Sequence, residues 1–255
     1  MIDTHSHIYL KDFKDDFDGM LNRAKAVGIT EIYLPNIDKD SIADLNRTAL
    51  ENPMCKPMMG LHPGSVKADY KEQLATVITE LQNPERKFYA VGEIGIDLYW
   101  DKTFVEEQKM VFATQIELAK EMGLPIVIHC REAFDEVFEV LEAHNSENLF
   151  GIFHCFTGNV EQALRAINLN MKLGIGGVVT FKNAGLDKVI EQINLEHLVL
   201  ETDAPYLAPM PFRGKKNEPS YIKYVAEKIA EIKGVSLQQV DEITTTNAKS
   251  VFERT

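Results

Sequence analysis

The feature that most constrains the fold is a short apolar run that recurs eight times along the 255 residues. Each run is followed by a polar or glycine-rich turn and then by a longer amphipathic stretch, which is typical of strands that alternate with helices. The runs are apolar at nearly every position, as in a parallel sheet covered by helices. They occupy residues 1–4, 31–35, 57–61, 87–92, 125–128, 149–153, 171–175 and 197–200.

Eight strand–helix units in about 250 residues predict an α/β protein with the (β/α)₈ barrel, also called the TIM barrel. The rival fold, an open doubly wound sheet, normally has a glycine-rich loop after an early strand. Here that position holds His5-Ser6-His7, and no linker or internal repeat is evident. We therefore expect one barrel domain over residues 1–255, with helices over 13–27, 65–81, 104–122, 221–233 and 236–252.

Charge and composition limit the possible partners and the compartment. The 39 acidic and 27 basic residues leave a net charge of −12, which argues against a broad basic surface for duplex DNA. No signal peptide or uncharged run of about 18 residues is visible, so no membrane association is expected. Cys55, Cys130 and Cys155 are too few and too widely spaced for a disulfide framework. We expect a cytoplasmic protein, and no protein partner is evident.

Residues that can bind metal follow five of the eight predicted strands. Because the carboxyl ends of barrel strands open on one face, side chains far apart in the sequence should meet there. Taken singly, each could be a polar strand end or a helix cap, but their shared placement favours one site. The set is His5, His7, Glu93, His129, His154 and Asp203.

Neutral imidazole and carboxylate groups are the donors that divalent transition metals accept. Six ligands exceed what a single ion usually needs, whereas two ions about 3.5–4 Å apart would use them all and keep open positions. Glu93 lies on the strand between the two groups of histidines, so it is the natural bridge. The expected cofactors are therefore two divalent ions, such as Mg²⁺, Mn²⁺ or Zn²⁺.

Other side chains near these strand ends are candidates for substrate binding. His62 precedes Pro63-Gly64, and it either contacts substrate or satisfies a turn. Arg131 and the loop cations Arg213, Lys215 and Lys216 form either a solvated surface or a clamp for phosphate. The cysteines that follow His129 and His154 should face away from the site, because alternate residues of a strand point to opposite sides.

With these residues identified, several longer motifs carry a resemblance over essentially the whole chain. They are GEIGIDLYW around Glu93, PIVIHCREA around His129, GIFHCFTG around His154, ETDAPYLAP around Asp203, and RGKKNEP. Together with His5-Ser6-His7, they resemble the TatD family of metal-dependent deoxyribonucleases among the amidohydrolase-type barrels. The loop has Lys215-Lys216 where an arginine is common, and this departure does not touch the ligands.

The resemblance implies a two-metal site that hydrolyses DNA phosphodiesters, with the 3′ to 5′ exonuclease activity of some members. We expect single-stranded ends as the substrate, because a flexible terminus can reach the floor of a barrel mouth whereas a stiff duplex cannot bend into it. The resemblance places one ion on His5, His7, Asp203 and Glu93, and the second on Glu93, His129 and His154. Metal-activated hydroxide would attack phosphorus, with Asp203 as general base and Glu93 as the catalytic bridge.

Two alternatives remain open. The same hydroxide can cleave an amide, a lactone or a phosphotriester, although a neutral substrate leaves the cations of the 213–216 loop unexplained. A metal-binding scaffold without turnover is the other alternative, although a scaffold does not require open coordination positions.

Overall fold

The structure, a computed structural model, describes residues 1–253 and contains eight parallel strands. Three of them form one sheet in the order β1-β2-β3, and five form a second in the order β4-β5-β6-β7-β8. The strands are β1 (Ile2–Asp3), β2 (Glu31–Leu34), β3 (Cys55–Pro57), β4 (Val91–Asp97), β5 (Ile126–Arg131), β6 (Gly151–Phe153), β7 (Met171–Ile175) and β8 (Leu198–Leu200).

Single parallel bridges join the two sheets at both edges. Met59 pairs with Val91 between β3 and β4, and Ser6 pairs with Ala204 beyond β1 and β8. The Thr4 N–H also donates to the Leu200 carbonyl at 3.0 Å. These contacts bring the strands into the circular order of the (β/α)₈ barrel that the sequence predicts, although the ladders at the two joins are short.

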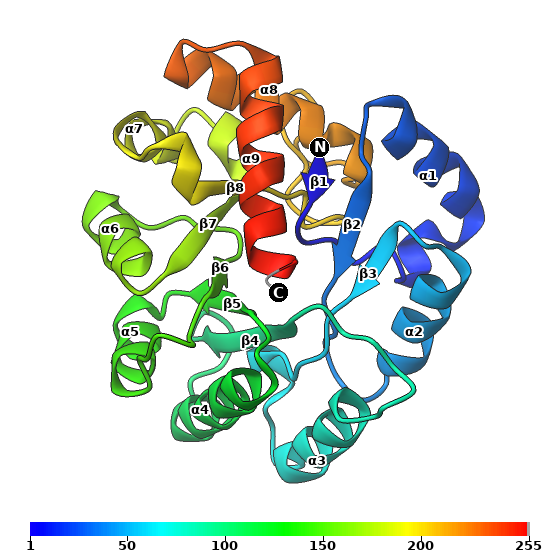
Figure 1. The fold of residues 1–255 in the computed structure, drawn as a ribbon, viewed down its shortest axis with the longest axis vertical. Coiled ribbons are helices and arrows are strands. Elements are labelled where there is room, and N and C mark those ends of the chain that lie inside the picture. The colour runs from blue at the N-terminus through cyan, green and yellow to red at the C-terminus, as the bar shows by residue number, and fades with distance from the viewer. Residues whose placement is uncertain (254–255) are drawn as a thin grey trace.

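Helices surround the strands, as Figure 1 shows in a view along the barrel. The barrel helices are α1 (Phe17–Ala26), α2 (Ile42–Glu51), α3 (Tyr70–Leu81), α4 (Val105–Met122), α5 (Phe134–Ala143), α6 (Val160–Asn168), α7 (Leu186–Gln192) and α8 (Ile222–Lys233), and α9 (Leu237–Phe252) follows them. None of the helices in residues 1–253 is both long and apolar enough to cross a bilayer.

Two strand predictions were misplaced. The third strand ends at Pro57, with only the Met59 bridge beyond it, and the fourth runs from Val91 to Asp97 instead of ending at residue 92. All seven residues of β4 are buried, including Glu93 and Asp97. The sequence predicts an earlier end because the second half of the strand carries polar residues and glycines, and of these Glu93 and Asp97 line the site.

Helix ends largely follow local signals. α4 ends at Gly123 and α8 at Gly234, and both glycines have the left-handed backbone that such ends favour. The Ser236 side chain caps α9 in a reciprocal pair with Gln239. The helix expected from residue 65 begins later, at Tyr70, after the short 3₁₀ turn η2 (Pro63–Ser65).

The apolar core has two parts. One lies between the strands and the surrounding helices, and the other includes strand residues such as Ile2 and Val199 together with Phe252 of α9. The Phe252 ring stacks on Tyr33 with centroids 3.6 Å apart. In Figure 1, α9 crosses in front of the strands near the start of β1. This helix therefore covers the amino ends of the strands and leaves their carboxyl ends for the site.

Candidate metal centre

Glu93 lies at the middle of the cluster because of an irregularity in β4. The register between β4 and β5 shifts between Gly92 and Ile94, and such a bulge redirects the side chain at that position. Glu93 is 2% exposed, and its Oε2 atom lies 3.2 Å from His5 Nε2 and 3.5 Å from His7 Nε2. Its Oε1 atom lies 2.7 Å from His129 Nδ1 and 3.5 Å from His154 Nε2. Each oxygen thus faces a different group of imidazoles.

Backbone hydrogen bonds bring the segment after β1 against the segment after β8. The Asp203 N–H donates to the His5 carbonyl at 2.9 Å, and the His7 N–H donates to the Ala204 carbonyl at 2.7 Å. Asp203 Oδ1 then lies 3.8 Å from His5 Nε2 and 3.7 Å from His7 Nε2. The structure therefore places Asp203 with the first group of histidines.

His154 adjoins both groups, because its ring also stacks on the His5 ring with centroids 3.5 Å apart. Three triads of side chains each bring their donor atoms within 4.8 Å of one another. They are His5–His7–Glu93, His5–His154–Asp203 and His62–Glu93–His129.

The donor atoms fit a divalent ion in both chemistry and spacing. A tetrahedral site with metal–nitrogen distances of about 2.0–2.1 Å requires donors roughly 3.4 Å apart. Several distances in the cluster are close to that value, including 3.3 Å between the Nε2 atoms of His5 and His7. Buried imidazoles beside carboxylates match the ligand preferences of zinc, manganese, iron and cobalt. The side chains present are therefore suited to hold metal.

Burial and mutual charge shift the pKa values in this cluster. Burial lowers the pKa of His5 well below its usual range. Burial opposes ionisation of Glu93, but the imidazoles of His62, His5 and His154 hold its pKa well below normal. Burial also opposes protonation of His154, but the Glu201 and Glu93 carboxylates raise its pKa to about 10. The cluster thus combines anionic carboxylates with buried imidazoles. The negative charge of the carboxylates favours a bound cation.

Burial raises the pKa of Asp203 to about 6, against the opposing effect of the His154 and His7 imidazoles. Its side chain is 12% exposed, compared with 3% for Glu93. Asp203 is thus the more accessible carboxylate of the cluster.

Carboxylates that the sequence reasoning missed hold the histidines from behind. Asp97 Oδ2 lies 2.9 Å from His129 Nε2, and Glu201 Oε1 lies 3.1 Å from His154 Nδ1. Such partners orient the ring of a metal-binding histidine. A signal was present in the even spacing from Glu93 to Asp97, since residues four apart on a strand face the same side. Glu201 lies beyond the end of β8, so strand alternation gave no signal for it.

The structure shows His62 in the turn role, one of the two roles left open by its sequence, and contact with substrate stays a prediction. Its Nδ1 atom accepts the Gly64 N–H at 2.9 Å, which stabilises the turn. Its Nε2 atom lies 3.4 Å from Glu93 Oε1 and 3.3 Å from His129 Nδ1. His62 also lines the cavity above the cluster, as does Arg131.

The three loop cations contact protein groups and are not among the described residues that line this cavity. The Arg213 guanidinium lies 4.5 Å from the Phe181 ring centre, and Lys215 Nζ lies 5.8 Å from that of Phe212. Lys216 Nζ donates to the Asp12 carbonyl at 2.8 Å. The loop cations therefore lie outside the cavity wall that includes Arg131.

The expectation for two cysteines was wrong in part, because Cys130 and Cys155 both line the cavity. Cys155 lies beyond the end of β6, where its backbone φ of +44° breaks the alternation of a strand. Cys130 also packs against the core between strands and helices, as expected.

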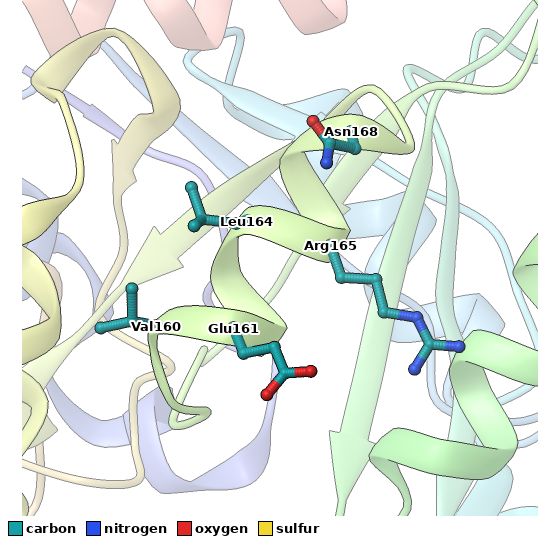
Figure 2. Close-up of a pocket in the computed structure, with 5 residues that line it drawn as sticks. All are labelled: Val160, Glu161, Leu164, Arg165 and Asn168. Atoms are coloured by element: carbon teal, nitrogen blue, oxygen red, sulfur yellow. The ribbon is translucent and has the colours of Figure 1, made fainter.

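The cavity at the carboxyl ends of the strands has a volume of about 710 Å³. Its wall includes His7, Glu93, His129, His154 and Asp203. A second hollow, shown in Figure 2, is lined by side chains of α6 alone, namely Val160, Glu161, Leu164, Arg165 and Asn168. Only the first hollow, among these two, brings together groups that can bind metal.

Comparison with known proteins finds relatives that match almost the whole chain. The family model of TatD-related DNases matches residues 2–253. The metal-dependent hydrolase YabD of Bacillus subtilis (strain 168) is 42% identical over 253 residues, which cover 99% of this chain and 98% of that protein. The metal-dependent hydrolase YjjV of Escherichia coli (strain K12) is 31% identical over 252 residues, covering 98% and 97% of the two chains.

Solved structures share the fold. The crystal structure of YjjV, a TatD homologue from Escherichia coli K12, superposes with a TM-score of 0.94 at 30% identity, covering 100% of this chain and 98% of that one. The phosphotriesterase homology protein of Escherichia coli, solved with phosphate in its active site, gives 0.73 at 15% identity and covers 98% of both chains. The second likeness concerns the fold alone.

Proposed function

This chain belongs to the TatD-related DNase family of metal-dependent hydrolases, and from that premise we propose that it is a deoxyribonuclease that removes nucleotides from the 3′ end of single-stranded DNA. The observation that carries the proposal is the division of the Glu93 carboxylate between two groups of imidazoles. A carboxylate that bridges two divalent ions is a recurring device of enzymes that hydrolyse phosphate esters.

In this proposal, His5, His7, Asp203 and Glu93 would hold one divalent ion. Glu93, His129 and His154 would hold the second. Divalent ions in such sites polarise a phosphoryl oxygen and lower the pKa of bound water toward neutrality.

The remaining steps belong to side chains of the chain itself. Asp203 accepts the proton of the attacking water, since it is the more accessible carboxylate of the cluster. Arg131 and His62, which line the cavity, bind the non-bridging oxygens of the phosphate. Arg213, Lys215 and Lys216 bind phosphates farther along the strand, outside the cavity wall.

The shape of the site favours a flexible strand end. A volume of about 710 Å³ falls within the range of roughly 300–1,000 Å³ that is common for sites of small ligands. A single-stranded terminus can enter such a cavity, whereas a duplex with a persistence length of about 150 base pairs cannot bend into it. We therefore expect the protein to cleave at the ends of DNA strands in preference to internal phosphodiester bonds.

The test uses purified protein with a panel of divalent ions and labelled single strands of DNA and RNA. Shortening of DNA from its 3′ end is the expected result, and a blocked 3′ end should prevent it. If a closed single-stranded circle is cut as fast as the linear strand, the exonuclease assignment is wrong. Hydrolysis of a lactone or phosphotriester with no cleavage of either nucleic acid would reject the nuclease assignment altogether.

Replacement of Asp203 by Asn should lower kcat by about 10²–10⁴-fold, the usual contribution of a positioned general base. Metal content is measured on the same sample, so that loss of the ion is separated from loss of the base. Near wild-type kcat in a metal-replete Asp203→Asn protein would contradict the proposed role.

A further inference from the structure

Two exposed aromatic side chains, Tyr99 and Trp100, follow β4, and Trp100 lies on the rim of the cavity. Trp100 is 76% exposed and Tyr99 is 48% exposed, and their rings meet edge to face with centroids 4.7 Å apart. Trp100 is one of the residues that line the cavity, together with His129 and Arg131. Large aromatic side chains exposed beside a binding cavity commonly mark a contact with a ligand.

Arg131 joins the two rings into one surface. Its guanidinium carbon lies 3.9 Å from the Tyr99 ring centre and 5.4 Å from that of Trp100. The backbone fixes this arrangement, since the Leu98 N–H donates to the Arg131 carbonyl at 2.9 Å. A positive group thus lies beside exposed aromatic faces, a combination that single-stranded nucleic-acid sites use.

The same turn is tied to the candidate metal centre through Asp97. Asp97 Oδ1 accepts the backbone N–H of Tyr99 at 2.9 Å and that of Trp100 at 3.4 Å. Its Oδ2 atom lies 2.9 Å from His129 Nε2. Gln108 of α4 holds Asp97 from the other side, by accepting its N–H at 2.8 Å and donating to its carbonyl. The aromatic rim therefore has a defined position relative to His129.

We propose that Tyr99, Trp100 and Arg131 form a platform on which one unpaired base of the substrate stacks, while Arg131 neutralises the adjoining phosphate. This inference rests on the proposed nuclease function. It adds the requirement that the substrate present an unpaired nucleobase. Stacking tolerates any base, because every base presents a π-face, but a base inside a duplex is already covered by its neighbours. The platform therefore selects single strands without selecting sequence.

The overall negative charge of the protein makes a local, uncharged contact with DNA favourable for binding. A net charge of −12 repels a polyanion over most of the surface, so productive contacts must be local. Stacking supplies affinity that does not depend on the charge of the protein, and Arg131 places one positive charge where the phosphate must lie.

The chain has a single tryptophan, so intrinsic fluorescence reports on Trp100 directly. The probe is a phosphorothioate oligothymidylate, which resists hydrolysis, and the control is an abasic strand of equal length and charge. The thymidylate strand should quench the fluorescence in a saturable manner, whereas the abasic strand should not. Equal responses to the two strands, or no response to either, would overturn the platform. This fluorescence measurement does not require the protein to hydrolyse the strand.

A kinetic experiment tests the same surface through Trp100→Ala and Trp100→Phe. On single-stranded oligothymidylate, Trp100→Ala should raise KM by about 5-fold to 150-fold, the range for loss of one stacked base, and Trp100→Phe should recover most of it. The matched control is Leu164→Ala, an exposed apolar side chain of α6 that is 50% exposed and lines the other hollow. It should leave KM unchanged.

The abasic strand separates stacking from a general structural effect, because Trp100→Ala should not change its KM. A wild-type KM for Trp100→Ala on thymidylate would overturn the platform while leaving the nuclease assignment intact. If the wild-type protein cleaves no nucleic acid with any divalent ion, the proposed function fails, and the fluorescence experiment still decides whether a base stacks on Trp100.

Discussion

Asp97 shows how much of the centre depends on side chains that need not touch metal. Its carboxylate contacts His129 on one oxygen and two backbone N–H groups of the aromatic turn on the other. Burial opposes its ionisation, but the hydrogen bond and charge of His129 hold its pKa below the ordinary value. The ionised Asp97 carboxylate therefore fixes the orientation of the His129 ring.

Replacing Asp97 by Asn should lower the affinity for divalent ions by about 10–100-fold, as is typical when the partner of a ligand histidine is lost. Calorimetric titration of metal-free protein measures this change. Asp101→Asn is the matched control, because this carboxylate lies in the same turn but pairs with Lys67 at 3.0 Å. Wild-type affinity in Asp97→Asn, or an equal loss in Asp101→Asn, would show that the contact does not position His129.

At the scale of elements, β4 and β5 approach so closely that only glycine fits at residue 95. Gly95 has a φ of +140°, and an added Cβ atom would lie 2.0 Å from the His129 carbonyl oxygen. The residue pairs with His129 in the register of the two strands. Close approach of these strands is what brings Glu93 to His129.

Gly95→Ala should therefore reduce the free energy of unfolding by about 2–5 kcal/mol, through backbone strain and overlap with β5 together. Gly123→Ala controls for the backbone alone, because Gly123 has a φ of +65° and nothing lies within 4 Å of an added Cβ. Gly123→Ala should lower the free energy of unfolding by only about 1–2 kcal/mol. Denaturation in urea measures both variants, and equal losses would argue against the close approach.

An ion pair connects α1 with the segment before α8. Arg23 of α1 donates to both carboxylate oxygens of Glu218, at 2.8–3.1 Å, and Ser220 also bonds to Glu218. Burial opposes ionisation of Glu218, but these partners hold its pKa below the ordinary value. A carboxyl group whose pKa falls on folding adds stability above its unfolded pKa, and that stability disappears as the pH drops through the folded pKa.

Glu218→Gln should accordingly lower the free energy of unfolding by about 1–3 kcal/mol at pH 7. The difference from wild type should shrink below about pH 4, near the unfolded pKa of a glutamate. Denaturation curves of both proteins between pH 7 and pH 3 give the comparison. A difference that stays constant over this range would mean that ionisation of Glu218 contributes nothing.

Sequence patterns predict which strands and helices form better than they predict the residues at which these elements begin and end. Eight strands and five of the helices follow from hydrophobic periodicity, but the predicted fourth strand ends at residue 92 because polar residues interrupt the apolar run. The candidate ligands were found because metal-binding residue types recur after strands. Glu201 and Asp97 were missed because they sit behind the ligands, and Trp100 was missed because a sequence does not show which aromatic side chains remain exposed.

At the scale of the molecule, the candidate ligands come from the ends of β1, β4, β5, β6 and β8, so bound metal connects much of the barrel. The unfolded chain offers no such arrangement, and a ligand that binds only the folded state stabilises it. Divalent ions at 100 times their Kd should add about 2.7 kcal/mol per site to the free energy of unfolding.

Thermal unfolding with excess chelator and with excess divalent ion tests this expectation. The Tm should rise with ion concentration in wild type, and the rise should be much smaller in Glu93→Ala, which removes the shared carboxylate. A Tm that does not respond to metal in wild type would contradict a centre that links the strands.

The hydrogen bonds between the segments after β1 and β8 also bear on the synthesis of the protein. Thr4 and Leu200, which join the two ends of the strand circle, are 196 residues apart in the sequence. On the ribosome, a nascent chain exposes His5 and His7 early, whereas Asp203 emerges after every other member of the cluster. Contacts between such distant residues carry a large loop-closure cost and need both segments to be present. Translation thus delays assembly of the hydrolytic centre until nearly the whole barrel has been made.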